Sequence, residues 1–317
     1  MRLLATLTLL LAALGSLACN RSTRKQIAVI PMGRSHVYWV SAHAGAVKAA
    51  REENVDIVWN GPATESDYSG QLQIVENMIN QHVDVICLAP IDRKALANAV
   101  DRASAAGIPV IIWDSPVDSK TFVAQIATDN YAAGQMGAVR MGEILQGKGR
   151  IVEVACQPGS ASTMAREKGF EDKIQSSYPG IHIVDKRYGM ADVAKSMTVA
   201  ENMLTAVSDL DGMFGSNETS TVGAARALTS AKSKVKLVGF DASPALIDGL
   251  KAGVIDSLVT QNPFDMGYKT VKAAVSKLNG GTVERIQNLP AVVVTRANLD
   301  EPAIHARLFP DLDPYLK

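Results

Sequence analysis

The segment Val235–Pro244 reads VKLVGFDASP, and an earlier segment, Ile108–Pro116, reads IPVIIWDSP. Both are rich in Val, Ile or Leu in their first half, which is typical of a strand buried on both faces. Both continue with an aromatic residue, an aspartate, small residues and a proline. We interpret the recurrence as two similar lobes that face each other across a cleft. The alternative is chance similarity between two parallel strands that share Val and Ile anyway.

The rest of the chain extends this pattern. From Gln26 onward, short β-branched runs alternate with longer segments of helical periodicity. Such alternation indicates βαβ units and a parallel sheet, so the predicted fold class is α/β. The predicted strands are Gln26–Pro31, Val55–Trp59, Val83–Ala89, Ile108–Trp113, Phe122–Ala127, Arg150–Ala155, Ile181–Val184, Gly212–Gly215, Val235–Phe240 and Ile255–Thr260. The predicted helices include Val40–Glu53, Gly70–Gln81, Arg93–Ala106, Tyr131–Gln146, Met164–Ser176, Val193–Ala206 and Ser220–Ser230.

Length, charge and cysteine content exclude several classes of protein. The chain has 317 residues, which corresponds to about two domains. Its 32 basic and 32 acidic side chains leave no cationic excess to attract nucleic acid, so no nucleic-acid partner is expected. Only Cys19, Cys87 and Cys156 occur, too few for a disulfide framework, and no CxxC pair suggests zinc.

The N-terminal residues predict export. Met1 and Arg2 precede an apolar run, Leu3–Leu14, and then Gly15–Cys19, which together form the pattern of a secretory signal. The apolar run is shorter than the roughly 20 residues that a membrane span requires. We therefore predict a signal peptide at residues 1–18 and a polar tether at residues 19–25.

Cys19 directly follows the predicted cleavage point. The segment before it resembles a bacterial lipoprotein box, whose cysteine would be lipidated. Ser16 stands where such a box usually has leucine, and Ser16-Leu17-Ala18 also fits an ordinary cleavage site. The expectation is a protein of the periplasm or cell envelope that is anchored through Cys19, and an unmodified Cys19 as the new N-terminus remains the alternative.

Polar and aromatic residues collect just beyond the predicted strands. Ligands of open parallel sheets bind beyond the carboxyl ends of the strands, where loops converge and helices begin. Flat apolar faces together with carboxylate and amide groups are what a sugar or polyol needs. The candidate ligand-binding residues at these ends are His36, Tyr38, Trp39, Ala89, Asp114, Ser115, Asn217, Phe240, Asp241 and Gln261.

Most candidates also have a purely structural interpretation. Asp114 or Asp241 could cap the following helix, and Tyr38 with Trp39 could be the hydrophobic start of one. Asn217 opens an Asn-Glu-Thr sequon, Arg166 could be a solvated helix charge, and Gln261 could belong to a turn.

Motifs of enzymes are absent from the sequence. It contains no HExxH, GxSxG, P-loop or GxGxxG, and its five histidines have no metal-ligand spacing. Cys87 lies in an apolar strand and is interpreted as a buried thiol, while Cys156 ends a strand. We expect no catalysis, no metal and no cofactor.

Several segments resemble the type I periplasmic sugar-binding proteins of ABC importers, a ribose-binding-like group that shares its core with LacI-type repressors. They are Pro109–Asp114, Ala127–Asn130, Ala165–Phe170, Phe214–Glu218, Val238–Asp241 and Gln261–Pro263. The resemblance implies two Rossmann-like lobes with parallel sheets, joined by a hinge with three crossings near Thr128, Asn262 and Pro290. It assigns residues 26–127 plus 263–289 to an N-terminal lobe and 128–262 plus 290–317 to a C-terminal lobe.

The resemblance also implies roles for individual residues. The aromatic pair falls on Tyr38 and Trp39, the first-lobe aspartate on Asp114, and the second-lobe arginine on Arg166. The remaining positions fall on Asn217, Phe240, Asp241 and Gln261. The ribose-binding pattern has asparagine at the positions of His36 and Ala89, arginine at Ser115 and an aromatic residue near Ala191, and these departures make ribose itself a doubtful ligand.

The predicted function is that of an exported, monomeric solute-binding protein that closes two lobes over a monosaccharide or polyol and docks on an ABC permease. One alternative is a sensory protein that presents its ligand to a chemoreceptor or sensor kinase. A repressor with the same core would need an N-terminal helix-turn-helix, and an export signal occupies that position instead. An exported carbohydrate-active enzyme would need two carboxyls around a scissile bond, for which Asp114 and Asp241 are the candidates.

Overall fold

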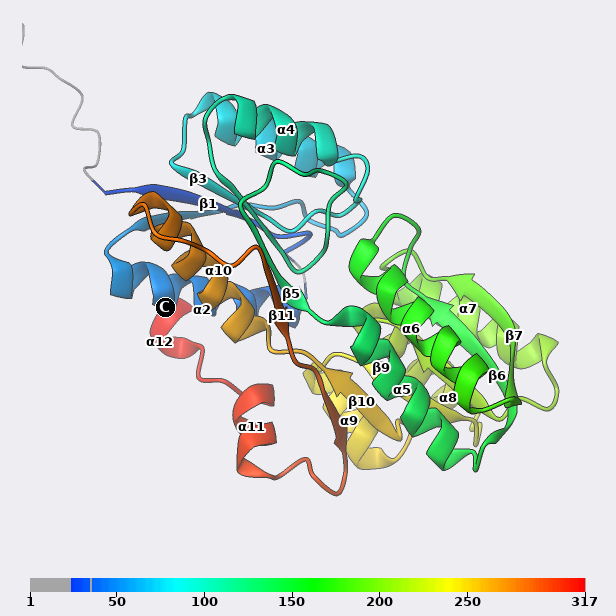
Figure 1. Cartoon of the computed structure of the whole chain (residues 1–317). Helices are drawn as coiled ribbons and strands as arrows, with labels where there is room; N and C mark the ends of the chain where they lie inside the picture. The colour runs from blue at the N-terminus through cyan, green and yellow to red at the C-terminus, as the bar shows by residue number, and fades with distance from the viewer. Residues whose placement is uncertain (1–23, 35, 317) are drawn as a thin grey trace, which may run out of the picture.

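The computed structural model describes residues 24–34 and 36–316. The predicted signal peptide, Cys19 and most of the tether therefore lie outside the described residues. Two six-stranded sheets form the cores of two lobes (Figure 1). In the order of strand pairing the first sheet is β11-β5-β4-β3-β1-β2, and the second is β12-β10-β9-β8-β6-β7. Strand pairing is parallel except between β10 and β12, which confirms the predicted α/β fold.

The first lobe contains the N-terminal strands and the returning strand β11. Its strands are β1 (Gln26–Ile30), β2 (Asp56–Trp59), β3 (Val85–Leu88), β4 (Val110–Trp113), β5 (Ala124–Thr128) and β11 (Ile286–Leu289). Its helices are α2 (Val37–Glu53), α3 (Tyr68–Asn80), α4 (Ala97–Ala105) and α10 (Pro263–Leu278). On β1, Ile27 and Val29 pack in the cluster with α2 and α10, whereas Ala28 and Ile30 pack with α3 and α4. Alternate residues thus face the two layers of helices.

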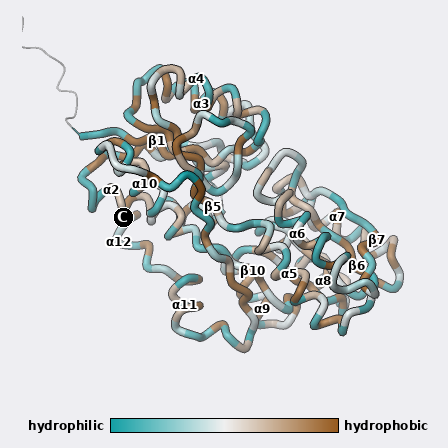
Figure 2. Tube along the Cα trace, in the orientation of Figure 1, coloured by the Kyte–Doolittle hydropathy of each residue, from teal (hydrophilic) through white to brown (hydrophobic). Residues whose placement is uncertain are grey.

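The second lobe repeats this arrangement. Its strands are β6 (Lys148–Ala155), β7 (Gly180–Tyr188), β8 (Gly212–Gly215), β9 (Lys236–Phe240), β10 (Ser257–Thr260) and β12 (Val292–Thr295). Its helices are α5 (Asn130–Ile144), α6 (Ala161–Ser177), α7 (Val193–Ala206), α8 (Glu218–Ser230) and α9 (Pro244–Ala252). The hydropathy of the chain matches these layers, since Figure 2 shows hydrophobic residues concentrated along β1, β5 and β10.

The chain crosses between the two sheets at three places. It leaves the first sheet after β5 at Thr128, returns between β10 and α10, and leaves again between β11 and β12. These places match the predicted crossings, and a hinge with several crossings permits the lobes to rotate without either one unfolding. No helix in the described part of the chain is both long enough and apolar enough to span a bilayer.

The C-terminal segment, which contains α11 (Pro302–Leu308) and α12 (Asp313–Leu316), reaches back to the first lobe. Arg51 of α2 donates from Nη2 to the carbonyl oxygen of Tyr315 over 3.4 Å, and the rings of Phe264 and Tyr315 lie 5.7 Å apart. The predicted lobe ranges assigned all of residues 290–317 to the second lobe. The boundaries remain a prediction, but α12 itself contacts α2.

Candidate functional site

The carboxyl ends of the two sheets meet at a narrow cavity between the lobes. Its free volume is about 30 Å³, roughly the space for one water molecule, so a larger ligand requires the lobes or side chains to move apart. Side chains of both lobes line it: Met32, His36, Tyr38, Trp39, Glu65, Asp114, Ser160, Ser162, Thr163, Arg166, Asn217, Glu218, Thr219, Asp241 and Gln261. Eight of the eleven predicted ligand residues are among them.

Asp114 presents a buried carboxylate on the first-lobe side. It follows β4 directly and has a positive φ of 62°, which turns the chain sharply at the end of the strand. The hydroxyl of Tyr38 donates to Oδ1 of Asp114 over 2.5 Å. Burial raises the pKa of Asp114 to about 6, although the Tyr38 hydrogen bond and the charge of Arg166 act in the opposite direction. Asp114 caps no helix, so this structural alternative is wrong.

Trp39 belongs to an aromatic cluster at the start of α2. It packs edge-on against Tyr38 and Trp113, with ring centroids 4.9 Å and 5.4 Å away. Its Nε1 donates to Oε1 of Glu65 over 2.7 Å, and Nε2 of His36 lies 3.7 Å from the same oxygen. Trp39 therefore lies in the first turn of α2, and its indole N–H also holds the carboxylate of Glu65 at the cavity wall.

Arg166 of α6 is the buried cation on the second-lobe side. It is 3% exposed, so the interpretation as a solvated helix charge is wrong. Its Nε donates to Oδ1 of Asn130 over 2.7 Å, and its Nη1 donates to the carbonyl oxygen of Ser216 over 3.2 Å. The guanidinium lies 4.0 Å from the ring centroid of Phe240, a cation–π arrangement. These contacts hold the guanidinium in one position.

Asp241 and Gln261 connect the cavity to the hinge. Gln261 donates from Nε2 to Oδ1 of Asp241 over 2.6 Å and accepts at Oε1 from the hydroxyl of Thr128 over 2.7 Å. Thr128 ends β5, where the chain makes its first crossing. Oδ2 of Asp241 accepts from the backbone N–H of Glu218 over 3.1 Å and lies 3.8 Å from Nη1 of Arg166. The carboxylate of Asp241 therefore accepts a hydrogen bond from the start of α8, and not from the start of α9, the helix that follows it in the chain.

Asn217 precedes α8 and caps it. Its Oδ1 accepts from the backbone N–H of Ser220 over 3.1 Å, and its Nδ2 donates to the hydroxyl of Thr219 over 3.0 Å. The cap stabilises the first turn of α8, which carries Glu218 and Thr219 at the cavity wall. Asn217 thus caps a helix and also lines the cavity.

Three predicted ligand residues do not line the cavity. Ala89 is fully buried, and its carbonyl oxygen accepts from Nε2 of Gln71 over 2.7 Å. Ser115 accepts at Oγ from the backbone N–H of Ser162 over 3.1 Å, which joins the two lobes beside the cavity. Phe240 lies beneath the guanidinium of Arg166. The side chains of all three are fully covered, so none of them forms the wall of the cavity in this structure.

Two acids at the cavity wall, Glu65 and Glu218, were not predicted. Burial raises the pKa of Glu65, and it raises that of Glu218 to about 8 with Asp241 and Glu65 adding to the effect. Oε2 of Glu218 is buried and has no hydrogen-bond partner among the described residues. Glu218 belongs to the segment Phe214–Glu218 and so was within reach of the sequence argument. Glu65 lies in a loop after β2, where no periodicity indicates it.

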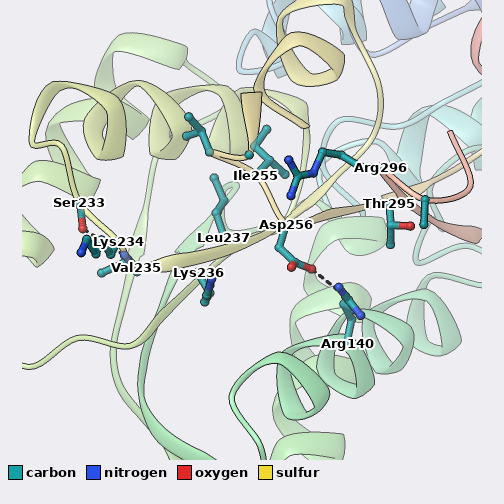
Figure 3. A pocket seen from close by; sticks show the side chains of 13 residues that line it. Arg140, Ser233, Lys234, Val235, Lys236, Leu237, Ile255, Asp256, Thr295 and Arg296 are labelled. Atoms are coloured by element: carbon teal, nitrogen blue, oxygen red, sulfur yellow. Dashed lines mark hydrogen bonds and ion pairs between the residues drawn. The ribbon is translucent and has the colours of Figure 1, made fainter. Parts of the chain in front are cut away.

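A larger pocket lies elsewhere, at the amino ends of β9 and β10 (Figure 3). Its volume is about 610 Å³, and exposed Lys234, Lys236 and Arg296 line it. Arg140 donates from Nε to Oδ1 of Asp256 over 2.7 Å across this pocket. Its position at the amino ends of the strands distinguishes it from the ligand sites of open parallel sheets. Among the described residues, no group of three or more His, Cys, Asp or Glu side chains is arranged to hold a metal ion.

Comparison with known proteins agrees with this geometry. The family model "Periplasmic binding protein domain" matches residues 27–282. The ribose import binding protein RbsB of Escherichia coli is 29% identical over 90% of this chain and 95% of its own length. A carbohydrate transporter solute-binding protein of Agrobacterium radiobacter, solved with D-arabinose, is 31% identical with a TM-score of 0.89, over 91% of this chain and 100% of that one.

A second solved structure is similar to the same degree. The ABC transporter solute-binding protein of Agrobacterium vitis, with bound D-fucose, is 34% identical with a TM-score of 0.87, and the match covers 90% of this chain and 100% of that one. The family model covers well over half of the chain, and these relatives are aligned along nearly their whole length. The chain therefore belongs to the periplasmic binding protein family.

Proposed function

We propose that the chain is an exported solute-binding protein of an ABC importer, which captures a monosaccharide or polyol between its two lobes. The proposal rests on one observation, which is that charged side chains of both lobes line the same cavity. Asp114 follows a strand of the first lobe, and Arg166 belongs to a helix of the second. A hydroxyl held between a carboxylate and a guanidinium forms charge-assisted hydrogen bonds to both lobes. A ligand that binds in this way stabilises the closed form selectively.

Aromatic and amide groups complete the proposed sugar site. Trp39 and Tyr38 supply apolar ring surface at the cavity, while Asn217, Asp241 and Gln261 supply donors and acceptors. Sugars bind where such rings cover C–H groups and polar groups meet adjacent hydroxyls. The relatives described above, which include binding proteins for ribose, D-arabinose and D-fucose, support a sugar ligand.

The cellular setting follows from the predicted export signal. After cleavage the chain would act in the periplasm as a monomer, tethered through a lipid on Cys19, and its closed form would dock on a membrane permease. Mass spectrometry of the protein from membranes should find a diacylglyceryl group on Cys19. Size-exclusion chromatography with light scattering should give the mass of one chain.

A thermal-shift screen over pentoses, hexoses, deoxy-sugars and polyols tests the proposal. A ligand at a hundred times its Kd adds about 2.7 kcal/mol to the free energy of unfolding, which raises the melting temperature measurably. We expect at least one compound to raise it in a concentration-dependent way. If none does, the proposal is wrong. Uptake of the labelled ligand by cells with and without the protein then separates import from presentation to a receptor.

A further inference from the structure

A second pocket adjoins the cavity between the lobes, and we call it the side pocket. Its volume is about 280 Å³, compared with about 30 Å³ for the cavity. Its lining residues lie within the ranges 37–41, 241–247, 261–263 and 307–312. Tyr38, Asp241 and Gln261 line both the side pocket and the cavity, so the two spaces share a wall.

The shared wall is divided between the two lobes. The hydroxyl of Tyr38 donates within the first lobe, to Asp114. Asp241 accepts within the second lobe from the backbone N–H of Glu218 and, at the hinge, from Nε2 of Gln261. Among the described residues, no hydrogen bond joins Tyr38 to Asp241 or Gln261. When the lobes move apart, the wall therefore opens without the loss of a hydrogen bond across it, and the two spaces become continuous.

Large apolar side chains of both lobes and of the C-terminal segment line the side pocket. They are Val37 of α2, Ile247 of α9, and Leu308, Phe309 and Leu312 of the C-terminal segment. This segment runs from the second lobe to α2 and so completes the pocket (Figure 1). Val37 and Phe309 are 43% and 44% exposed. A ligand group that covers them removes apolar surface from water, which is favourable.

Only two of the residues that line the side pocket are charged, and both already have partners. Nη1 of Arg307 donates to the carbonyl oxygen of Pro290 over 3.0 Å. Oδ1 of Asp241 accepts from Nε2 of Gln261 over 2.6 Å. A sugar ring placed here would bury hydroxyls with few partners, which is unfavourable. The side pocket therefore suits an apolar group better than a second sugar ring.

We propose that the ligand is a sugar or polyol with an apolar substituent, such as an alkyl or aryl glycoside, and that the side pocket binds this substituent. The inference rests on the proposed function, since it specifies the ligand class of the same site. The sugar occupies the cavity, and the substituent passes between Tyr38 and Asp241 into the side pocket. Pockets for small molecules begin at about 300 Å³, so a volume of about 280 Å³ accommodates a group of the size of butyl or phenyl.

The experiment compares derivatives that differ only in the substituent. For each sugar or polyol that binds in the thermal-shift screen, the methyl, butyl and phenyl glycosides or ethers are titrated calorimetrically. We expect at least one butyl or phenyl derivative to bind at least about tenfold more tightly than the matching methyl derivative, a difference of about 1.4 kcal/mol. Its heat-capacity change on binding should also be more negative, because more apolar surface is buried.

Variants on two sides of the side pocket test where the substituent binds. Phe309→Ala and Val37→Ala each remove exposed apolar surface from this pocket. Each should reduce the ratio of the methyl dissociation constant to the butyl or phenyl one at least about threefold, because less apolar surface is buried. Leu316→Ala and Val184→Ala remove apolar side chains of similar exposure outside the pocket, and they should leave this ratio as it is in the wild-type protein.

Three results would overturn the proposal. If no butyl or phenyl derivative binds more tightly than its methyl counterpart, the side pocket binds no substituent, and sugar binding itself stays intact. A gain in affinity that survives both Phe309→Ala and Val37→Ala places the substituent elsewhere on the protein. Failure of every compound in the screen to bind overturns both this proposal and the proposed function.

Discussion

The hydroxyl of Tyr38 donates a hydrogen bond to Oδ1 of Asp114 over 2.5 Å, so two predicted ligand residues are partners of each other. The two side chains come from α2 and from the residue after β4, which are neighbours only in the folded first lobe. The bond orients the carboxylate at the cavity, and it lowers the pKa of Asp114 from what burial alone would give. Tyr38 thus has a positioning role in addition to the ring contact predicted for it.

Removal of this hydroxyl should change both the affinity and its pH dependence. In Tyr38→Phe, Asp114 loses a donor, so ligand affinity should fall by about 1 to 2 kcal/mol. Asp114 accepts ligand hydroxyls when ionised, which requires a pH above its pKa of about 6, and loss of the Tyr38 hydrogen bond raises that pKa. The acidic limb of the affinity profile should therefore move to higher pH. Calorimetric titrations between pH 5 and 8 measure both effects.

The matched control for this experiment is Tyr131→Phe. Tyr131 is exposed, donates to Oδ2 of Asp172 over 2.9 Å and lies outside the cavity. Its affinity profile should overlay that of the wild-type protein. An unchanged acidic limb in Tyr38→Phe would contradict the coupling between Tyr38 and Asp114.

Arg166 should matter for affinity and for the stability of the unliganded protein. Arg166→Ala removes the donor to a proposed ligand hydroxyl, and affinity should fall at least about tenfold. It also leaves the buried Oδ1 of Asn130 without its donor, so the melting temperature of the unliganded protein should fall as well. Lys168→Ala, which removes an exposed helix charge paired with Asp172, should alter neither quantity appreciably. Undiminished affinity in Arg166→Ala would remove this residue from the site.

Tryptophan fluorescence should report the ligand through Trp39. Trp39 lines the cavity, whereas Trp113 is fully buried behind it at a centroid distance of 5.4 Å. Trp39→Phe should abolish most of the ligand-induced change in emission, and Trp113→Phe should preserve it. The opposite result would assign the ligand-induced change in fluorescence to the buried Trp113 and refute a contact between Trp39 and the ligand.

Glu153 should make stability depend on pH. It is fully buried on β6, and neither carboxylate oxygen has a hydrogen-bond partner among the described residues. Burial raises its pKa well above the ordinary 4.5, and Glu171 and Glu167 add to this. Because the native state holds a proton that the unfolded chain has lost above that value, the Glu153 contribution to stability falls as pH rises.

Substitution Glu153→Gln removes this titration. The free energy of unfolding of Glu153→Gln minus that of the wild-type protein measures the effect of the substitution. This difference should be at least about 1 kcal/mol more positive at pH 7 than at pH 5. Urea denaturation at the two pH values measures the difference, and Glu284→Gln serves as the exposed control. Parallel pH profiles of the wild-type and Glu153→Gln proteins would exclude Glu153 as the titrating group.

The strands and helices of the cores follow from local pattern alone. Each strand and helix predicted by residue range overlaps an observed element of the same kind. In β1, Ile27 and Ile30 lie in different hydrophobic clusters, and a continuous apolar run is the expected signature of a strand buried on both faces. The recurrence of aromatic-Asp at the ends of β4 and β9 likewise predicted two residues, Asp114 and Asp241, that the structure places in one cavity.

The strands β11 and β12 were not predicted, and for β11 the reason is physical. The sequence of β11 reads IQNL, and its side chains are mostly exposed at a sheet edge, so no run of buried residues distinguishes it. The strand β11 forms because its backbone pairs with that of β5, for example at Leu289 and Thr128, which are far apart along the chain. Such pairing energy depends on the partner strand and leaves little trace in the local sequence.

The charge balance of the cavity is likewise a product of tertiary structure. Periodicity shows which face of a helix or strand is buried, and this was sufficient to indicate the α/β fold class and the ends of the strands. It does not show which side chains of distant elements meet. Glu65 lies in a loop of one lobe and Glu218 at the start of a helix in the other, and only the approach of the two lobes brings both acids to the same cavity.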